Sequence, residues 1–245
     1  MHDLVILTGH SSGLGLAILE ELLQGPYKVI AIAQRRLARV QDNLLEISCD
    51  LSQPIGELLQ ELRTAIDLQV AALRSITLIN NAANSGPIAL AGHLDFEAMA
   101  RSVALNVAAP MQLMNLLAGY QSQVFIRLLQ ISSGAAHKSY PGWMVYCSCK
   151  AAIRMSAQVL AAEAELAGSG LRVLIYEPGI LDTPMQTELR TLGKEQFPGI
   201  DRFLNLYKEG QLVAPKDSAR QLVRLWQDPT RPPFEEVRYD PKFKT

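Results

Sequence analysis

Tyr146 and Lys150, which lie four positions apart, are the pair of residues with the clearest potential for chemistry. On a helix this spacing places both side chains on one face, about one turn apart. A free tyrosine has a pKa near 10, too high for efficient proton exchange at neutral pH, and a neighbouring ammonium lowers that pKa. The pair therefore indicates acid–base catalysis by the Tyr146 phenol. Ser133 lies thirteen residues upstream of Tyr146, at the predicted end of a strand.

An alternation of strands and helices must position these three side chains. Six short, nearly continuous apolar runs are typical of parallel strands buried on both faces, and a seventh run lies near the end of the chain. The runs are 4–7, 29–33, 44–48, 76–79, 124–131, 171–176 and 235–239. Helical patterns separate them at about 13–24, 54–72, 95–119, 144–168 and 215–227. This order predicts a Rossmann-type α/β fold, a doubly wound parallel sheet of about seven strands with right-handed crossovers and helices on both faces.

The pattern contains no linker, internal repeat or low-complexity stretch, so residues 1–245 are predicted to form a single domain. Two connections depart from the regular alternation. The connection 34–43 leaves room for a crossover helix of one or two turns only. The segment 184–212 is a mixed polar and aromatic insertion after the carboxyl end of a strand, where a substrate lid would lie. A helical pair that only packs on the surface is the alternative for this segment.

The first strand runs directly into a glycine-rich turn, Thr8-Gly9-His10-Ser11-Ser12-Gly13-Leu14-Gly15. Gly9 permits a tight turn, Gly13 lets the backbone approach a pyrophosphate, and Gly15 allows close packing of helix and sheet. The helix that follows offers free N–H groups and a partial positive charge to phosphates. The turn therefore predicts a nucleotide site. Its expected contacts are Gly9, Ser11, Ser12, Gly13, Leu14 and Gly15.

The TGxxxGxG spacing of this turn makes it the first of six pieces that resemble the classical short-chain dehydrogenase/reductase (SDR) family. The other five follow in the family's order along essentially the whole chain: Asn80-Asn81-Ala82-Ala83, Asn106, Ile131-Ser132-Ser133, the Tyr146-to-Lys150 piece and the Pro178-to-Thr183 piece. A YxxxK pair alone is a weak signal, whereas six ordered pieces are specific. Ala83 replaces the glycine that usually ends the second piece, and we expect only a small local adjustment of the backbone.

The resemblance implies an oxidoreductase in which Tyr146 protonates the developing alkoxide while a nicotinamide delivers hydride to the carbonyl carbon. It assigns Ser133 to the carbonyl oxygen and Asn106 to a water that links Lys150 to solvent, with a kink-holding role in its helix as the alternative for Asn106. The nicotinamide carboxamide is expected at the Ile180 backbone and the Thr183 hydroxyl. The remaining cofactor contacts implied by the family are Asn81, Ala82, Tyr146, Lys150, Pro178 and Gly179.

The residues after the second strand predict NADP(H) as the cofactor. An acidic residue at this position binds the ribose 2′-hydroxyl of NAD, whereas an arginine accommodates the 2′-phosphate of NADP. The strand here ends Ala33-Gln34-Arg35-Arg36, with no carboxylate in reach. Arg35 can pair with a phosphate through its planar fork and Arg36 can assist, with solvated surface charges as the alternative. Asp50 resembles the family's adenine contact, although capping the next turn is an equally natural role.

Three local stretches resemble sepiapterin reductases and the bacterial benzil-reducing carbonyl reductases: 142–147, 176–186 and 237–240. Trp143 and Met144 beside Tyr146 predict an apolar substrate pocket that accepts aromatic groups. Asp240 matches by position a carboxylate that binds pterin in sepiapterin reductases, with a turn aspartate before Pro241 as the alternative. Ser12 stands where those enzymes usually carry arginine. The predicted function is NADPH-dependent reduction of a ketone, a diketone or a pterin side-chain carbonyl.

Two other functions stay open at this point. The first is a 3-oxoacyl, sugar or steroid alcohol dehydrogenase of the same family. The second is a regulator that senses NADP(H) without turnover; such proteins usually lose the Tyr/Lys pair, which this chain keeps.

The composition indicates a folded cytoplasmic protein. Of 245 residues, 49% are hydrophobic and 19% charged, with a net charge of −1, so we expect no disorder and no nucleic-acid or membrane partner. No run reaches 18 apolar residues, and we expect neither a signal peptide nor a membrane span. The three cysteines and four histidines lack the spacing of a disulfide framework or a metal site. Small residues on 95–119 and 144–168 predict a homodimer or homotetramer contact there, although the core of a monomer would look similar.

Overall fold

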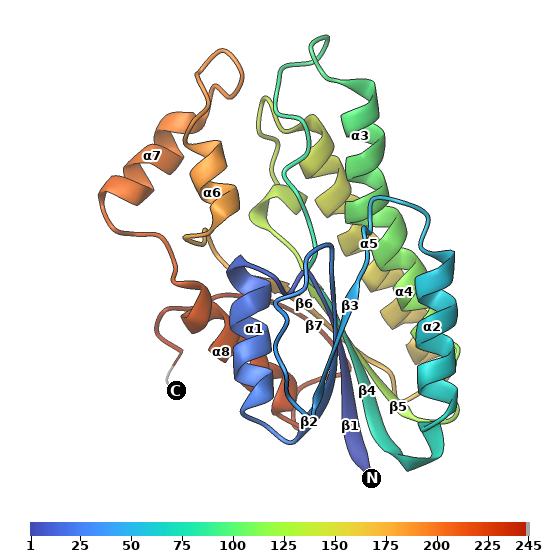
Figure 1. Ribbon diagram of the computed structural model, residues 1–245. Helices are drawn as coiled ribbons and strands as arrows, with labels where there is room; N and C mark the ends of the chain where they lie inside the picture. The colour runs from blue at the N-terminus through green and yellow to red at the C-terminus, as the bar shows by residue number, and fades with distance from the viewer. Residues whose placement is uncertain (244–245) are drawn as a thin grey trace.

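The computed structural model describes residues 1–243 and contains one seven-stranded sheet in which all neighbouring strands are parallel. The strand order is β3-β2-β1-β4-β5-β6-β7, so the winding direction reverses between β1 and β4 (Figure 1). The strands are β1 (His2–Thr8), β2 (Tyr27–Ala33), β3 (Leu44–Ser48), β4 (Leu73–Asn80), β5 (Phe125–Ile131), β6 (Arg172–Glu177) and β7 (Phe234–Arg238). Each of the seven predicted runs overlaps one strand, and the doubly wound parallel fold is confirmed.

Helices cover both faces of the sheet (Figure 1). α1 (Gly13–Leu23) and α8 (Pro215–Gln227) pack together on one face. α2 (Gly56–Asp67), α4 (Ala109–Ala118) and α5 (Met144–Leu166) cover the other face. The remaining helices are α3 (Phe96–Val103), α6 (Pro184–Leu189) and α7 (Ile200–Lys208). No helix within residues 1–243 is long and apolar enough to cross a membrane.

The central strands are continuously apolar because both of their faces are buried. In β1, Leu4 and Ile6 point toward α2, α4 and α5, whereas Val5 and Leu7 point toward α1 and α8. All four side chains are at most 1% exposed. Successive residues of a strand face opposite sides of the sheet, so two cores require apolar residues at every position.

Three predicted helices differ in detail from the structure. The pattern at 95–119 is divided: α3 ends at Val103, a π-helical turn spans Ala104–Ala108, and α4 follows. The pattern at 54–72 ends early, because α2 stops at Asp67 and a 3₁₀ turn covers Val70–Ala72. The connection 34–43, which left room for one or two helical turns at most, has no helical residue.

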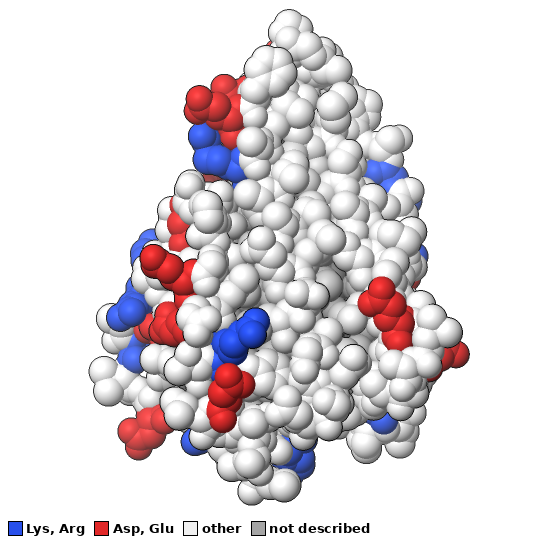
Figure 2. Space-filling view, turned by 90° about the vertical axis from the view of Figure 1, so that its right-hand side faces the viewer, with Lys and Arg blue, Asp and Glu red and all other residues white. Residues whose placement is uncertain are grey.

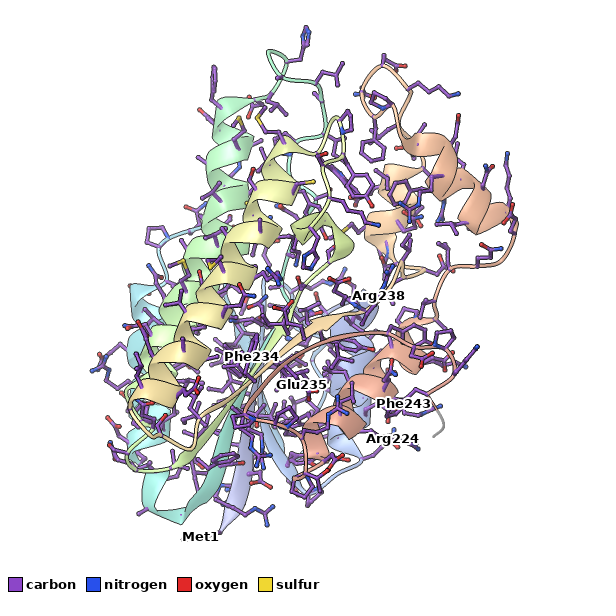
Figure 3. The ribbon with its side chains drawn as sticks, turned by 180° about the vertical axis from the view of Figure 1, so that it is seen from behind. Met1, Arg224, Phe234, Glu235, Arg238 and Phe243 are labelled. Atoms are coloured by element: carbon purple, nitrogen blue, oxygen red, sulfur yellow. The ribbon has the colours of Figure 1, made fainter. Side chains whose placement is uncertain are left out.

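The segment 184–212 contains α6 and α7 and lies over the carboxyl end of the sheet. The pale orange helices of this segment stand opposite the start of α5 in the view from behind, and Arg238 marks the end of β7 nearest to them (Figure 3). At the base of the segment, Leu181 pairs with Val213 in an isolated parallel bridge. Phe197, which is completely buried, and Phe203 anchor the segment to the rest of the chain.

Candidate active site

The predicted site pieces follow the carboxyl ends of four neighbouring strands. The glycine-rich turn follows β1, Asn81 follows β4, Ser132 and Ser133 follow β5, and Pro178 follows β6. Because these strands are parallel, their carboxyl ends meet at one edge of the sheet, at the point where the winding reverses. The fold therefore brings together pieces that are up to about 170 residues apart in the sequence.

The glycines of the turn are required by close contacts. A Cβ atom on Gly15 would lie 2.0 Å from the Gly9 carbonyl oxygen, and one on Gly9 would lie 2.8 Å from Ala82 Cα. Gly9 and Gly13 also have positive φ angles of 73° and 54°, which L side chains rarely adopt. A Cβ on Gly13 would approach the Thr183 methyl group to 3.2 Å. The turn after β1 thus faces the segment after β6 across a narrow space.

Thr8 and Asn81 fix the shape of this turn. The Thr8 hydroxyl accepts the N–H groups of Asn81 and Ala82, both at 3.0 Å. The Asn81 side chain donates to the carbonyl oxygens of Thr8 (3.0 Å) and Gly9 (3.2 Å). Sequence reasoning placed Asn81 and Ala82 at the cofactor but gave Thr8 no role. The signal for Thr8 was a hydroxyl residue at the last position of a strand, directly before the first glycine.

The start of α1 leaves hydrogen-bonding groups free for a ligand. Ser12 is the N-cap of α1, in an extended conformation, and its side chain makes no capping bond. The first N–H groups of a helix lack partners within the helix and commonly bind phosphate. Ser11 is half-buried, whereas the Leu14 side chain packs in the core, which leaves Leu14 only its backbone for a nucleotide. This cradle fits the pyrophosphate of a dinucleotide.

Arg35 and Arg36 are exposed in the loop after β2, at the end of the site that would hold the adenosine. Asp50 acts as a turn cap: one carboxylate oxygen accepts the backbone N–H (2.9 Å) and the hydroxyl (2.7 Å) of Ser52. Its second oxygen accepts a long bond of 3.4 Å from the Gln34 amide. The capping alternative for Asp50 is therefore present in the structure, and the adenine contact stays a prediction.

The segment after β6 is held by backbone contacts and leaves one hydroxyl free. Gly179 has a φ of +82°, and the Ile180 carbonyl oxygen accepts the Val213 N–H at 2.8 Å. The Pro178 carbonyl accepts the Ser218 hydroxyl at 3.1 Å. Thr183 is the N-cap of α6 but its side chain makes no capping bond. Its hydroxyl is thus available opposite Gly13, where the nicotinamide carboxamide was predicted.

Tyr146 and Lys150 lie one turn apart on α5, and both are buried, with exposures of 8% and 5%. The Lys150 ammonium donates to the Ile131 carbonyl at 3.1 Å and lies 5.8 Å from the centre of the Tyr146 ring. Burial raises the pKa of Tyr146 to about 12, against a smaller opposing effect of the Ser133 side chain. Burial also lowers the pKa of Lys150 to about 8.

The expected lowering of the Tyr146 pKa is therefore not found. The cause is that burial disfavours the phenolate, while the Lys150 ammonium donates to the Ile131 carbonyl and not to the phenol oxygen. A phenol with a pKa of about 12 keeps its proton at neutral pH. Tyr146 is thus suited to donate a proton rather than to accept one.

Of the two serines after β5, Ser133 is the one whose side chain hydrogen-bonds Tyr146 and acts to lower the pKa of that phenol. The Ser133 oxygen accepts the Ala135 N–H at 3.2 Å, and its hydrogen bond to Tyr146 places the hydroxyl beside the phenol. Ser132 is only 2% exposed and its hydroxyl has no partner within residues 1–243. These contacts fit the predicted role of Ser133 at the carbonyl oxygen.

Asn106 lies inside the π-helical turn between α3 and α4, 4% exposed. Its carboxamide pairs with the backbone of Asn84, accepting the N–H at 3.0 Å and donating to the carbonyl at 3.1 Å. The Asn84 side chain in turn accepts the Ser102 hydroxyl at 2.8 Å. Burial raises the pKa of the thiol of Cys149, the neighbour of Lys150, against a smaller opposing effect of its hydrogen bond with Asn106. The Asn106 side chain thus holds the irregular turn, as the alternative role proposed, and Asn84 was missed because its partners are distant in sequence.

Aromatic side chains form one wall beside Tyr146. The Trp143 ring packs against Tyr146 with centroids 5.0 Å apart, and against Phe197 (4.8 Å) and Phe203 (5.5 Å) of the 184–212 segment. Tyr140 packs edge-on against Trp143 at 5.5 Å. The 184–212 segment therefore contacts the start of α5 through Trp143. The Trp143 ring provides an apolar surface next to the Tyr146 phenol.

Asp240 lies in a different neighbourhood. Its backbone N–H donates to the Gln221 side chain on α8 at 3.0 Å, and its carboxylate accepts the Lys242 N–H at 2.9 Å. It lines a cavity of about 170 Å³ together with Asp217 and Arg220. The turn alternative for Asp240 is therefore present in the structure, and its contact with a pterin stays a prediction.

Comparison with known proteins identifies the family. The sequence profile described as short chain dehydrogenase matches residues 3–192. The chain belongs to the short-chain dehydrogenase family. This family binds a nicotinamide cofactor, and its members are oxidoreductases, so this short-chain dehydrogenase is an oxidoreductase whose residues around the glycine-rich turn and Thr183 fit such a cofactor.

Relatives with known names place the short-chain dehydrogenase near two groups of reductases. It is 33% identical to "Benzil reductase ((S)-benzoin forming)" of Bacillus cereus, over 96% of this chain and 98% of that protein. It is 34% identical to sepiapterin reductase of Meriones unguiculatus, over 92% and 91% of the two chains. Among solved structures, the KRED1-Pglu enzyme superposes with a TM-score of 0.78 at 29% identity, covering 91% of this chain and 94% of that one. The predicted resemblance to the benzil and sepiapterin reductase branch is confirmed.

Proposed function

We propose that the protein is an NADPH-dependent carbonyl reductase that acts on ketones or diketones bearing aromatic groups. The observation that carries the proposal is the buried Tyr146–Lys150 pair, which lies beside the aromatic wall of Trp143 at the edge of the sheet that holds the glycine-rich turn. The similarity to benzil reductases and sepiapterin reductases supports the same chemistry, because both names describe carbonyl reduction.

Ser133, Tyr146 and Lys150 have separate roles in the proposed reaction. Bound NADPH would supply the hydride that reaches the carbonyl carbon. Ser133 turns its hydroxyl proton from Tyr146 to the carbonyl oxygen and so holds this oxygen beside the phenol. Tyr146, protonated at neutral pH, transfers its proton to this oxygen as negative charge develops on it. The Lys150 ammonium stabilises the phenolate that remains and favours its reprotonation.

The loop after β2 supports NADPH over NADH. Arg35 and Arg36 are exposed there and free to meet a 2′-phosphate, and Gln34 before them carries no charge. Within the described chain, the Asp50 carboxylate hydrogen-bonds Ser52 and Gln34 and forms no ion pair with these arginines. A guanidinium pairs with phosphate through two parallel hydrogen bonds, which an unphosphorylated ribose cannot accept in the same way.

The aromatic wall favours a diketone such as benzil over a pterin. Phe197 and Phe203 are buried against Trp143, and the Trp143 ring that they hold beside Tyr146 is the aromatic surface a phenyl group would meet. The carboxylate that would bind a pterin, that of Asp240, is engaged in a turn beside α8. The segment 184–212 acts as the substrate lid in this proposal, since it supplies Phe197 and Phe203.

The first experiment is to follow NADPH absorbance with benzil, sepiapterin and a simple 3-oxoacyl ester, and to repeat the best case with NADH. Turnover of benzil with a preference for NADPH is the expected result. Turnover of the ester alone would favour the 3-oxoacyl alternative, and tight NADPH binding without any turnover would favour the regulator. Tyr146→Phe keeps the ring and its packing but removes the proton donor, so it should retain NADPH binding and lose turnover; unchanged activity would refute the assignment.

The proposal includes a homo-oligomer assembled through α4 and α5. Figure 2 shows the side of the molecule on which α2, α3, α4 and α5 lie, with few charged residues across a broad central area. Several large apolar side chains of α3 to α5 are exposed: Val103, Met111, Met144, Met155 and Val159. An uncovered apolar area of this kind is typical of an interface. Light scattering should give at least a dimer, and Val159→Lys should lower the mass; a monomeric wild type would refute it.

We also place the enzyme in the cytoplasm. Cys49, Cys147 and Cys149 are free thiols, which suits a reducing compartment where NADPH is available. Cell fractionation tests this part, and recovery of the activity outside the cytosolic fraction would overturn it.

A further inference from the structure

The loop that carries Arg35 and Arg36 has no helix to define its shape. It contains Ala38, whose φ of +54° lies in the left-handed region that disfavours an L side chain with a Cβ atom. A conformation of this kind persists only where surrounding contacts enforce it. The question is therefore which contacts hold the loop, and with it the two arginines.

Glu46 on β3 supplies these contacts. One oxygen of its carboxylate accepts the Leu37 N–H at 2.8 Å, and the other accepts the Arg39 N–H at 3.1 Å. The two donors flank Ala38, so the carboxylate fixes the strained position from both sides. Glu46 is only 9% exposed. Burial alone raises the pKa of this carboxyl group, but the bonds from Leu37, His10 and Arg39 together lower it below its ordinary value, so the group is a carboxylate.

The same carboxylate binds the glycine-rich turn through His10. The His10 ring is completely buried, and its Nε2 lies 2.7 Å from the Glu46 oxygen that also accepts the Leu37 N–H. A carboxylate only accepts hydrogen bonds, so Nε2 carries a proton and donates it. His10 stands between Gly9 and Ser11, in the turn predicted to hold the pyrophosphate. Glu46 therefore connects the two loops that would enclose the adenosine end of the dinucleotide.

We propose that His10 and Glu46 form a clamp that positions Arg35 for the 2′-phosphate, and that Glu46 is a specificity-determining residue for the cofactor. The inference rests on the proposed preference for NADPH. The clamp acts on Arg35 by fixing the backbone at Leu37 and Arg39, two and four residues beyond it. The Glu46 carboxylate is 9% exposed and already accepts three bonds from the protein, so it faces the two loops and not a ribose hydroxyl. It is a positioning residue and not a ligand.

The test is calorimetric binding of 2′,5′-ADP and of 5′-ADP, two probes of which only the first carries a 2′-phosphate. Wild type should bind 2′,5′-ADP more tightly. Glu46→Gln has the same size but lacks the charge and one acceptor, so it should weaken 2′,5′-ADP about 10-fold, the loss of roughly one charge-assisted hydrogen bond. Binding of 5′-ADP should change by less than about 2-fold, because it does not use Arg35. Glu57→Gln, on the exposed start of α2, is the matched control and should change neither value.

Two further comparisons distinguish the positioning of Arg35 from a general loss of structure at the cofactor site. In an Arg35→Ala background, Glu46→Gln should no longer affect 2′,5′-ADP, because the clamp works through that arginine. His10→Gln retains a side-chain N–H donor and should keep the preference, whereas His10→Leu should lose it. Equal weakening of both probes by Glu46→Gln, or the same effect with and without Arg35, would overturn the clamp. If wild type itself shows no preference for 2′,5′-ADP, the NADPH proposal fails, independently of the variants.

Discussion

Carbonyl reduction should slow as the pH rises above about 8, because Lys150 loses its proton there. The pKa of Lys150 falls from 10.5 to about 8 through burial, and at 1.36 kcal/mol per pKa unit this difference corresponds to about 3 kcal/mol of lost hydration. Below this pKa the ammonium is present and stabilises the Tyr146 phenolate left by proton transfer. Above it the lysine is neutral, and kcat/KM should fall about tenfold per pH unit.

Tyr146 adds no second titration to the pH profile between about pH 6 and pH 10. Its pKa of about 12 keeps the phenol protonated throughout, so the acid form is available at every pH tested. The direction of the pH dependence follows from these two groups: the rate of reduction is constant at neutral pH and declines on the alkaline side. The measurement is kcat/KM for benzil with saturating NADPH between about pH 6 and pH 10.

Lys150→Met is the variant that tests the cause. Methionine is unbranched and fills a similar buried space without a charge, so the residual rate should be about 100-fold lower and should show no alkaline limb. Thermal melting provides the control for folding. A decline near pH 8 that persists in Lys150→Met would show that another group titrates, and a wild-type rate that rises with pH would show that Tyr146 acts as a base; either result refutes the reasoning.

Other substitutions test separate parts of the site. Arg35→Ala should raise the KM for NADPH about 10-fold or more without changing kcat, because it removes a phosphate contact, and a change in kcat alone would contradict this. Trp143→Ala should lower the stability by about 3–5 kcal/mol in denaturant titration, as a buried aromatic ring is lost, and should raise the KM for benzil. Asn106→Ala should lower the free energy of unfolding by about 1–3 kcal/mol, since it leaves the Asn84 backbone unpaired. An unchanged melting temperature would argue against a stabilising role for the bonds between Asn106 and Asn84. Gly15→Ala should abolish cofactor binding measured by NADPH fluorescence, because a Cβ would lie 2.0 Å from the Gly9 carbonyl oxygen.

The strands were predictable because each is a continuous apolar run, a pattern produced by burial on both faces. The irregular turn at Ala104–Ala108 was not, because it depends on bonds from Asn106 to Asn84, 22 residues away in the sequence. The absence of a helix in 34–43 likewise follows from Glu46, which binds this connection from the neighbouring strand.

In the candidate site, too, local patterns were predictable and contacts between distant residues were not. The positions of Tyr146, Lys150 and Ser133 follow from spacing and strand ends, which are local properties of the sequence. The protonation of Tyr146 does not, since it results from burial by the assembled chain. The roles of Thr8 and His10 depend on partners that only the folded sheet brings within hydrogen-bonding distance.

The strand order has a consequence for how the chain assembles during synthesis. β2 joins β1, β3 joins β2, and β4 then adds to the free side of β1; β5, β6 and β7 each extend the edge just formed. No strand has to insert between two that are already paired. The sheet can therefore grow as the chain leaves the ribosome, in line with folding that starts from the N-terminus. The core under α1 stays open to solvent until α8 is complete at Gln227, so this half of the nascent protein is the part that needs protection longest.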